Sequence, residues 1–229
     1  MSVFGFVQAG GGSKRFGADK ALVHFEGKTL LARTVELVSS VCEETKIVAP
    51  LGKYGDATVP ILADRWPGQG PLGGILTALH HSNEPLHNSA ESLNAAGRAY
   101  DYALIVSCDM PFLTREWLAY LCDHAVKSSA RVIVPESESG LEPLCACWRT
   151  DAAPTIQIAF DDGIRKVTEA MKRLPMEVLD ESAWKRFDTD GRLFWNMNTP
   201  ADYEEARRVF EKSAGPFGKS QGKQARPLQ

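Results

Sequence analysis

The sequence predicts an α/β protein with a doubly wound, mostly parallel sheet flanked by helices. Short apolar runs typical of strands alternate with segments of helical periodicity, which implies parallel strands joined by helical crossovers. Residues 3–8 form one such run, and residues 103–106 carry the strongest buried-strand pattern in the chain. Each run leads directly into residues suited to ligand binding. Ligands of such sheets bind beyond the carboxyl ends of strands, so we expect the site there.

The N-terminal part of the chain is predicted to run β-α-β-β-α. Apolar residues recur at helical spacing after Thr29, which is placed to cap the helix. Pro71 follows Gly70 and suits the first turn of a second helix. A polar stretch over 82–97 is too long for an ordinary connection and is interpreted as a surface excursion. The predicted elements are strand 3–8, helix 30–41, strands 46–49 and 59–62, and helix 71–81.

The C-terminal part continues the alternation of strands and helices. Thr114 and Thr199 are placed to cap the helices that follow them. The predicted elements are strand 103–106, helix 114–126, strands 131–134 and 144–148, a helix from about 151, helix 164–174, strand-like runs 176–179 and 193–196, and helix 200–210. Residues 1–212 are predicted to form a single domain. Residues 213–229 lack apolar periodicity and are predicted to be a disordered tail.

Composition excludes several classes of protein. In 229 residues, 26 Lys and Arg stand against 29 Asp and Glu, so a net charge of −3 argues against a dedicated nucleic acid binder. No stretch approaches the roughly 20 apolar residues of a membrane span, and the N-terminus is typical of a strand rather than a signal peptide. We therefore expect a cytoplasmic protein. The five cysteines form no CxxC pair and are interpreted as reduced, mostly buried thiols.

The loop over residues 9–20 holds four glycines and three cations directly after a strand. Glycines let backbone N–H groups turn toward a phosphate, and Lys and Arg supply the charge, so the loop is typical of a triphosphate cradle. A solvated loop is the alternative. A Walker A loop needs glycine where Asp19 stands, and the dinucleotide fingerprint needs glycine where Arg15 stands, so neither motif applies.

Asp109 follows the strongest predicted strand. A carboxylate there is a hard oxygen ligand suited to Mg²⁺, which usually takes one or two carboxylates together with substrate phosphates. Asp109 could instead cap the following helix, but Thr114 lies closer to the start of that helix. The sequence thus favours a magnesium ligand.

Four motifs now resemble those of the molybdenum cofactor guanylyltransferases. They are Gly10-Gly11-x-Ser13-x-Arg15-x-Gly17-x-Asp19-Lys20, Gly70-Pro71-Leu72-Gly73-Gly74, Cys108-Asp109-Met110-Pro111 and Asn196-Met197-Asn198-Thr199-Pro200. The resemblance spans about residues 3–210. It implies a Rossmann-like sheet of the nucleotide-diphospho-sugar transferase type. It also implies transfer of GMP from GTP to the terminal phosphate of molybdenum-molybdopterin, with release of pyrophosphate.

The resemblance also implies a role for each matching residue. Arg15, Lys20 and Asp109 would be catalytic, and Asp109 with Asn198 would hold Mg²⁺. Asp64 would accept hydrogen bonds from N1–H and N2–H₂ of guanine. Transient contacts with molybdopterin-delivering and molybdoenzyme-assembly proteins are expected, and nucleic acid and membrane partners are not. The residues expected to line the nucleotide are Gln8, Ala9, Gly10, Gly11, Lys20, Asp64 and Asp109.

Three departures from the family pattern keep alternatives open. Gln8 replaces a usual Leu, Ala49-Pro50 stands where an Asn is common, and Glu142-Pro143-Leu144 replaces His-Pro-Leu. A cytidylyltransferase acting on molybdopterin or another small phosphorylated acceptor is one alternative, and Asp64 discriminates against it. The other is a noncatalytic nucleotide-binding chaperone for molybdoenzyme assembly. The intact Arg15, Lys20 and Asp109 argue against that second alternative.

Overall fold

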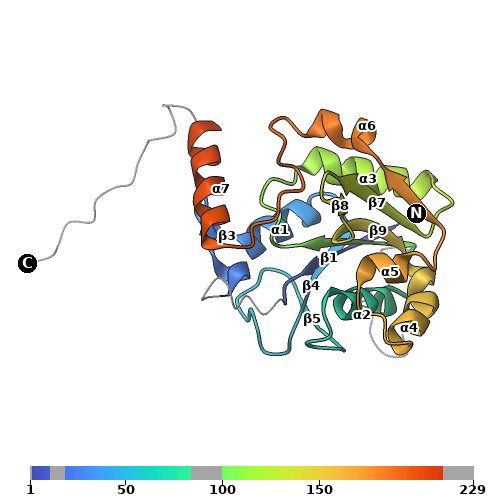
Figure 1. Ribbon diagram of the computed structural model, residues 1–229. Helices are drawn as coiled ribbons and strands as arrows, with labels where there is room; N and C mark the ends of the chain where they lie inside the picture. Colours follow the sequence, from blue (N-terminus) through green and yellow to red (C-terminus); the bar gives the residue numbers. More distant parts are fainter. Residues whose placement is uncertain (1, 11–18, 84–99, 214–229) are drawn as a thin grey trace, which may run out of the picture.

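The computed structural model describes residues 2–10, 19–83 and 100–213 (Figure 1). Arg15, Gly11, most of the predicted excursion and residues 214–229 lie outside this part. The strands are β1 (Val3–Gln8), β4 (Glu44–Ala49), β5 (Ile61–Ala63), β6 (Tyr102–Ser107), β7 (Val132–Ser137), β8 (Gly140–Leu141), β9 (Cys145–Arg149) and β10 (Met176–Leu179), with β2 (His24–Phe25) and β3 (Lys28–Thr29) in a separate hairpin. The helices are α1 (Leu30–Ser39), α2 (Pro71–Asn83), α3 (Arg115–Lys127), α4 (Ala153–Asp161), α5 (Val167–Met171), α6 (Glu181–Trp184) and α7 (Pro200–Ser213).

The main sheet has the strand order β10-β7-β9-β6-β1-β4-β5, with β8 paired to β7. Its pairings are parallel except where β9 meets β6 and β7 and where β8 meets β7, which confirms the predicted mostly parallel sheet. The chain moves outward from β1 through β4 to β5 and then returns to the other side of β1 as β6. The strand order therefore reverses between β1 and β6, where such sheets open a crevice for ligands.

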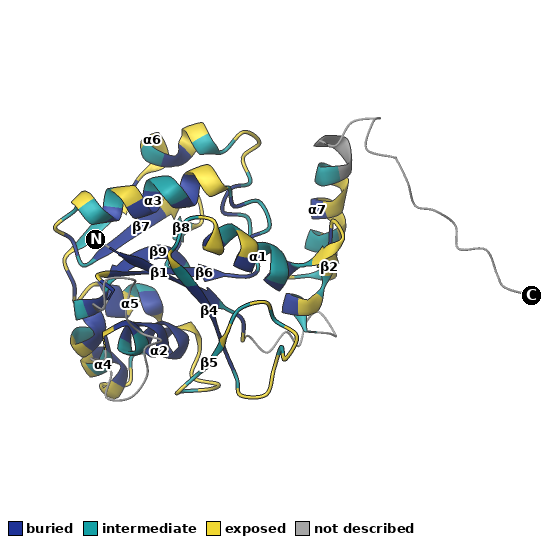
Figure 2. Cartoon of the chain, turned by 180° about the vertical axis from the view of Figure 1, so that it is seen from behind, coloured by how far each residue is buried: buried dark blue, intermediate teal, exposed yellow. Residues whose placement is uncertain are grey.

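Two apolar layers cover the sheet, as the alternation of side chains along β1 illustrates. Val3 and Val7 pack on the side of α1, α3 and α6, whereas Phe4 and Phe6 pack on the side of α2, α4 and α5 (Figure 1). The central strands are buried on both faces, as Figure 2 shows. This double burial explains why their sequences are continuously apolar.

A smaller core lies under α7, which stands beside the β2–β3 hairpin and α1 (Figure 1). Phe25, Leu30, Met197 and Ala206 are buried there. The Tyr203 hydroxyl donates to the His24 carbonyl at 3.1 Å. This core fixes two segments that flank the sheet edge, the one before α1 and the one before α7. No helix in the described ranges is long and apolar enough to span a membrane.

Two predicted elements differ in the structure. The strand over 193–196 is wrong: the segment is a turn whose backbone is held by Asp188 Oδ1, which accepts from the amides of Arg192 and Leu193. Its apolar side chains pack individually instead of pairing. The helix over 164–174 is reduced to α5, because Ile164 belongs to the C-terminal cap of α4, where its amide donates to Ala159 O after Gly163 at φ +88°.

Candidate functional site

The site lies where β1 and β6 end side by side. Gln8 is the register partner of Ser107, and the Cys108 amide donates to the Gln8 carbonyl at 3.4 Å. The glycine loop and the Asp109 loop therefore leave the sheet from the same edge. Burial, and then the charge of Asp109, raise the pKa of the Cys108 thiol to about 12, so this thiol stays protonated and is no nucleophile at neutral pH.

Three predicted residues from distant parts of the chain meet at this edge. Lys20 Nζ donates to Asp109 Oδ2 at 2.9 Å and to Asn198 Oδ1 at 3.0 Å. The Lys20 and Asp109 side chains are only 14% and 19% exposed. Water screens such a pair less than a surface pair. Fold and motif thus bring together a cation, a carboxylate and an amide oxygen that the sequence had suggested separately.

Asp19 fixes the backbone beside Lys20. Its carboxylate caps the short 3₁₀ turn Lys20–Leu22 by accepting from the Ala21 amide, and it also accepts from Lys53 Nζ at 2.8 Å and from the Tyr54 hydroxyl at 2.9 Å. Burial opposes ionisation of Asp19, but the bonds from Lys53 and Tyr54 outweigh it and hold the pKa of Asp19 below its ordinary value. Sequence reasoning missed this role, because Lys53 and Tyr54 lie on a different loop.

Asn198 is positioned by the start of α7. The Asp202 carboxylate accepts from the Asn198 and Thr199 amides, each at 2.7 Å, and the Thr199 hydroxyl accepts from the Asp202 amide. This reciprocal capping confirms the prediction for Thr199. The Met197 amide donates to the Asp109 carbonyl at 2.8 Å, and the Met197 side chain is fully buried. The Asn198 loop is thereby attached directly to the Asp109 loop.

One oxygen of Asp109 has no hydrogen-bond partner among the residues that the structure describes. Oδ1 is buried and accepts no hydrogen bond from the described residues, whereas Oδ2 accepts from Lys20. A buried carboxylate oxygen without a donor fits a site completed by a ligand such as a cation. Thr114, not Asp109, caps α3. Within the described ranges no three His, Cys, Asp or Glu side chains converge to hold a metal, so Asp109 and Asn198 would need other ligands beside them.

Asp64 follows β5, and the structure gives it a turn role as well. Its Oδ1 accepts from the Trp66 amide at 2.9 Å and lies 3.1 Å from the Thr77 hydroxyl on α2. In the strand order β5 is three strands from β6, a separation of about 14 Å at roughly 4.8 Å per strand. Asp64 therefore lies at the sheet edge that carries Asp109 but well away from it.

Gln8 and Ala9 are engaged within the fold, and Gly10 is exposed. Gln8 Nε2 donates to the Pro71 carbonyl at 3.0 Å, and the Ala9 amide donates to Val48 O at 3.0 Å. Any backbone hydrogen bond between Ala9 and a nucleotide would therefore have to use the Ala9 carbonyl. The remaining predicted residues of the loop, Gly11 and Arg15, lie outside the described residues.

Glu142 is a neighbour of the site to which the sequence had assigned no role. Its side chain is buried, accepts from the Ser137 hydroxyl at 2.6 Å and is hydrogen-bonded to the Asn196 side chain. Burial raises the pKa of Glu142, the negative charge of Asp109 adds to the rise, and the hydrogen bonds oppose it. Only the position of Glu142 in the motif, where His is usual, marks it in the sequence.

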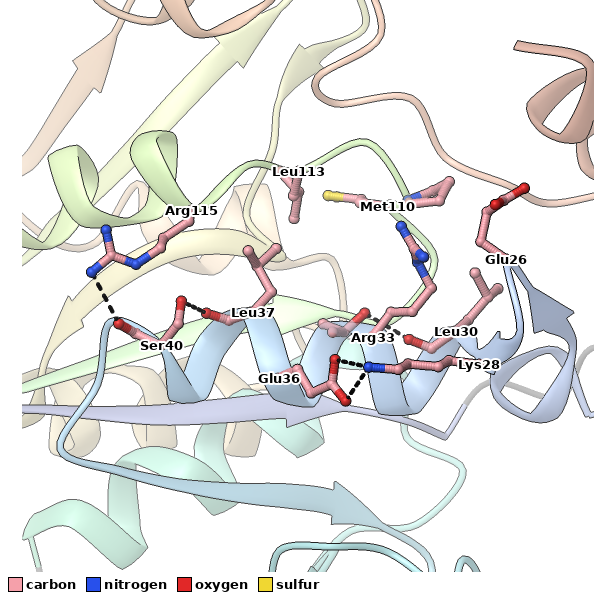
Figure 3. A pocket seen from close by; sticks show the side chains of 12 residues that line it. Glu26, Lys28, Leu30, Arg33, Glu36, Leu37, Ser40, Met110, Leu113 and Arg115 are labelled. Carbon is pink, nitrogen blue, oxygen red and sulfur yellow. Dashed lines mark hydrogen bonds and ion pairs between the residues drawn. The ribbon is translucent and has the colours of Figure 1, made fainter. Parts of the chain in front are cut away.

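A separate hollow of about 560 Å³ lies between α1 and the segment that follows Asp109 (Figure 3). Its walls carry both signs of charge, including Arg33 and Glu26, and the Lys28–Glu36 ion pair crosses one side. None of the predicted site residues in the described part of the chain lines it. The hollow thus lies apart from the polar side chains that converge at the ends of β1 and β6. We place the site at that sheet edge, where the polar groups are.

Taken together, the doubly wound sheet, the glycine loop after β1 and the Lys20–Asp109–Asn198 cluster at the switch point define a nucleotide-binding α/β protein. The chain belongs to the family of the MobA-like NTP transferase domain, whose model matches residues 5–175.

Similar proteins extend the match over most of the chain. A molybdenum cofactor guanylyltransferase of Desulfosudis oleivorans is 31% identical over 92% of this chain and 96% of that protein. A probable molybdenum cofactor guanylyltransferase of Clostridium perfringens is 27% identical over 87% and 93% of the two chains. Among solved structures, molybdopterin-guanine dinucleotide biosynthesis protein A of Archaeoglobus fulgidus has a TM-score of 0.75 at 26% identity and covers 91% of this chain and 99% of its own.

Proposed function

We propose that the protein transfers GMP from GTP to the terminal phosphate of molybdenum-molybdopterin, forming the guanine dinucleotide cofactor and releasing pyrophosphate. The observation that carries the proposal is the Lys20–Asp109–Asn198 cluster at the switch point of a MobA-like domain. The names of the relatives supply the substrates.

The reaction demands little acid–base machinery. A phosphate monoester has its second pKa near 6, so the acceptor is already an anion at pH 7. One of its oxygens forms a bond to the α-phosphorus of GTP, and the bond from that phosphorus to the bridging oxygen breaks as pyrophosphate leaves. The protein must neutralise the mutually repelling anions and hold them in line. In the proposal Lys20 and Arg15 supply positive charge to the phosphates.

The donor set at Asp109 fits Mg²⁺. The Asp109 carboxylate and the Asn198 amide oxygen are hard ligands, and the buried Oδ1 has no donor in the described part of the chain. Mg²⁺ usually keeps waters and substrate phosphates as its other ligands, so two protein ligands suffice. When bound there, the ion would supply positive charge that stabilises the negative charge developing on the phosphates.

Asp64 is the proposed contact to the base. Its carboxylate can accept from N1–H and N2–H₂ of guanine together, a pair that cytosine and uracil do not offer. The separation of about 14 Å from β6, at about 4.8 Å per strand, suits a nucleotide that lies across the strand ends with its base at β5 and its phosphates at Asp109. Gln8, Ala9 and Gly10 would lie along the middle of this path, and Gly11, which follows them in the sequence, is proposed as a further nucleotide contact.

The proposal is tested by following pyrophosphate release with molybdopterin, Mg²⁺ and each of GTP, CTP, UTP and ATP. Release should be fastest with GTP and should require both the acceptor and Mg²⁺. Preference for CTP would support the cytidylyltransferase alternative instead. Nucleotide binding without pyrophosphate release from any of the four would refute nucleotidyl transfer.

The proposal also covers compartment and partners. The five free thiols suit a reducing compartment, which supports the cytoplasm as the place of the reaction. Proteins that deliver molybdopterin and proteins that assemble molybdoenzymes are the proposed transient partners.

A further inference from the structure

In the structure, the Lys20 ammonium lies between the two residues proposed to hold the divalent cation, Asp109 and Asn198. The ammonium lies 2.9 Å from Asp109 Oδ2 and 3.0 Å from Asn198 Oδ1. An ammonium donates hydrogen bonds to carboxylate and amide oxygens, and a hard metal ion coordinates the same oxygens. Lys20 is thus bound to the Asn198 oxygen and to one oxygen of Asp109, which leaves only Asp109 Oδ1 without a donor among the described residues.

The two cations cannot share these oxygens without strong repulsion. A magnesium–oxygen bond is about 2.0–2.1 Å long, so a metal would stand within a few ångströms of the ammonium. The Lys20 and Asp109 side chains are 14% and 19% exposed, so water screens the repulsion on their side less than on an open surface, although Asn198 itself is exposed. Binding of one metal by both Asp109 and Asn198 therefore requires the ammonium to leave the Asn198 oxygen.

The Lys20 side chain can leave while its backbone stays in place. Asp19 holds that backbone through the Ala21 amide, Lys53 and Tyr54. The lysine stem of four carbons rotates freely enough to carry the ammonium to another partner. Nucleotide phosphates at the adjacent loop would be such a partner, since they offer several negative oxygens.

We propose that Lys20 serves as the resident cation of the free protein, so that a divalent cation binds well only once a nucleotide's phosphates have drawn Lys20 away. Nucleotide and metal then bind with positive coupling, and by linkage each raises the affinity for the other. The inference rests on the proposed function, because it takes the Asp109 site to be the metal site of nucleotidyl transfer.

The test is a titration with Mn²⁺ as a paramagnetic stand-in for Mg²⁺, followed by electron paramagnetic resonance without nucleotide. Wild type should bind Mn²⁺ weakly, and Lys20→Met should bind it at least about tenfold more tightly, within the usual range of such couplings. Lys20→Ala, which removes the whole side chain, should also bind Mn²⁺ more tightly and serves as a second test of the same residue. Thermal melts verify that each variant is folded.

Two controls separate occupancy from overall charge. Lys28→Met removes an equal charge from a lysine that pairs with Glu36 at 2.7 Å outside the site, and it should change Mn²⁺ affinity far less than Lys20→Met. Asp109→Asn in the Lys20→Met background should abolish the gain. Unchanged or weaker Mn²⁺ binding by both Lys20 variants would overturn the inference, as would an equal gain from Lys28→Met. Because the titration contains neither GTP nor acceptor, its outcome is independent of whether GMP is transferred.

Discussion

Substitution of Gly74 by alanine tests how β1 is packed against α2 at the edge of the site. A Cβ at Gly74 would lie 2.0 Å from Gln8 Nε2 and 2.8 Å from Gln8 Cδ. The Gln8 amide would have to move and would lose its hydrogen bond to the Pro71 carbonyl. The Gln8 side chain of β1 therefore fits against α2 only because residue 74 has no side chain.

The magnitude follows from three contributions. The lost hydrogen bond costs about 1 kcal/mol. Displacing the half-buried amide costs about 1–2 kcal/mol more, as for other overpacked contacts. Alanine favours the helix over glycine by about 1 kcal/mol, which offsets part of this loss. Gly74→Ala should thus lower the free energy of unfolding by about 1–2 kcal/mol, or the Tm by roughly 2–8 °C.

Urea denaturation in two backgrounds provides the assay. In Gln8→Ala the atoms that crowd position 74 are absent. There Gly74→Ala should stabilise the protein by up to about 1 kcal/mol through helix propensity. The effect of Gly74→Ala on the free energy of unfolding should therefore change sign between the wild-type and Gln8→Ala backgrounds. An equal destabilisation in both backgrounds would show that Gln8 does not pack against Gly74 and would refute the reasoning.

Further predictions concern the charged residues of the site. Lys20→Ala should raise KM for GTP and lower kcat/KM in steady-state assays, by an amount that corresponds to a loss of about 2–4 kcal/mol of transition-state stabilisation. Unchanged kinetics would remove Lys20 from the site. Asp64→Ala should reduce the difference in transition-state free energy between GTP and CTP, measured as kcat/KM, by about 1–3 kcal/mol. It should also weaken the turn in which Asp64 Oδ1 accepts from the Trp66 amide. Asp64→Asn keeps an oxygen for that turn, so it should lose the preference for GTP with little change in Tm. A GTP:CTP ratio unmoved in both variants would exclude the base contact. Glu142→Gln should raise stability at neutral and alkaline pH, because the raised pKa means that ionised Glu142 costs the folded state free energy. In melts against pH the gain should shrink as pH falls through the folded pKa toward the ordinary 4.5, and a gain independent of pH would contradict this cause.

The sequence predicted best the elements whose signals are local. The structure places β1 at Val3–Gln8, as predicted, because a buried parallel strand is apolar on both faces and glycines follow soon after its end. Thr29 and Thr114 cap α1 and α3 through their hydroxyls, as predicted. The β2–β3 hairpin was missed, because its turn residues Glu26 and Gly27, with φ of 52° and 79°, are not the usual Asn-Gly pair.

Contacts between distant segments escaped the sequence. The motifs named Lys20, Asp109 and Asn198, but their convergence depends on the crossover that places β6 beside β1 and on the core under α7. The Lys53 ion pair to Asp19 joins separate loops and has no periodic signature. The apolar run at 193–196 was taken for a strand because side-chain hydrophobicity does not tell whether the backbone finds a pairing partner.

The most direct test of the proposed transfer is a comparison of wild type with Asp109→Asn in one assay that quantifies guanine dinucleotide cofactor and pyrophosphate, alongside GTP binding. Wild type should form the two products in equal amounts. Asp109→Asn should lower turnover by about 10²–10³-fold while GTP affinity changes far less, because the metal acts mainly on charge that develops in the transition state. Near-normal turnover in Asp109→Asn, or pyrophosphate release without guanine dinucleotide product in wild type, would contradict the account.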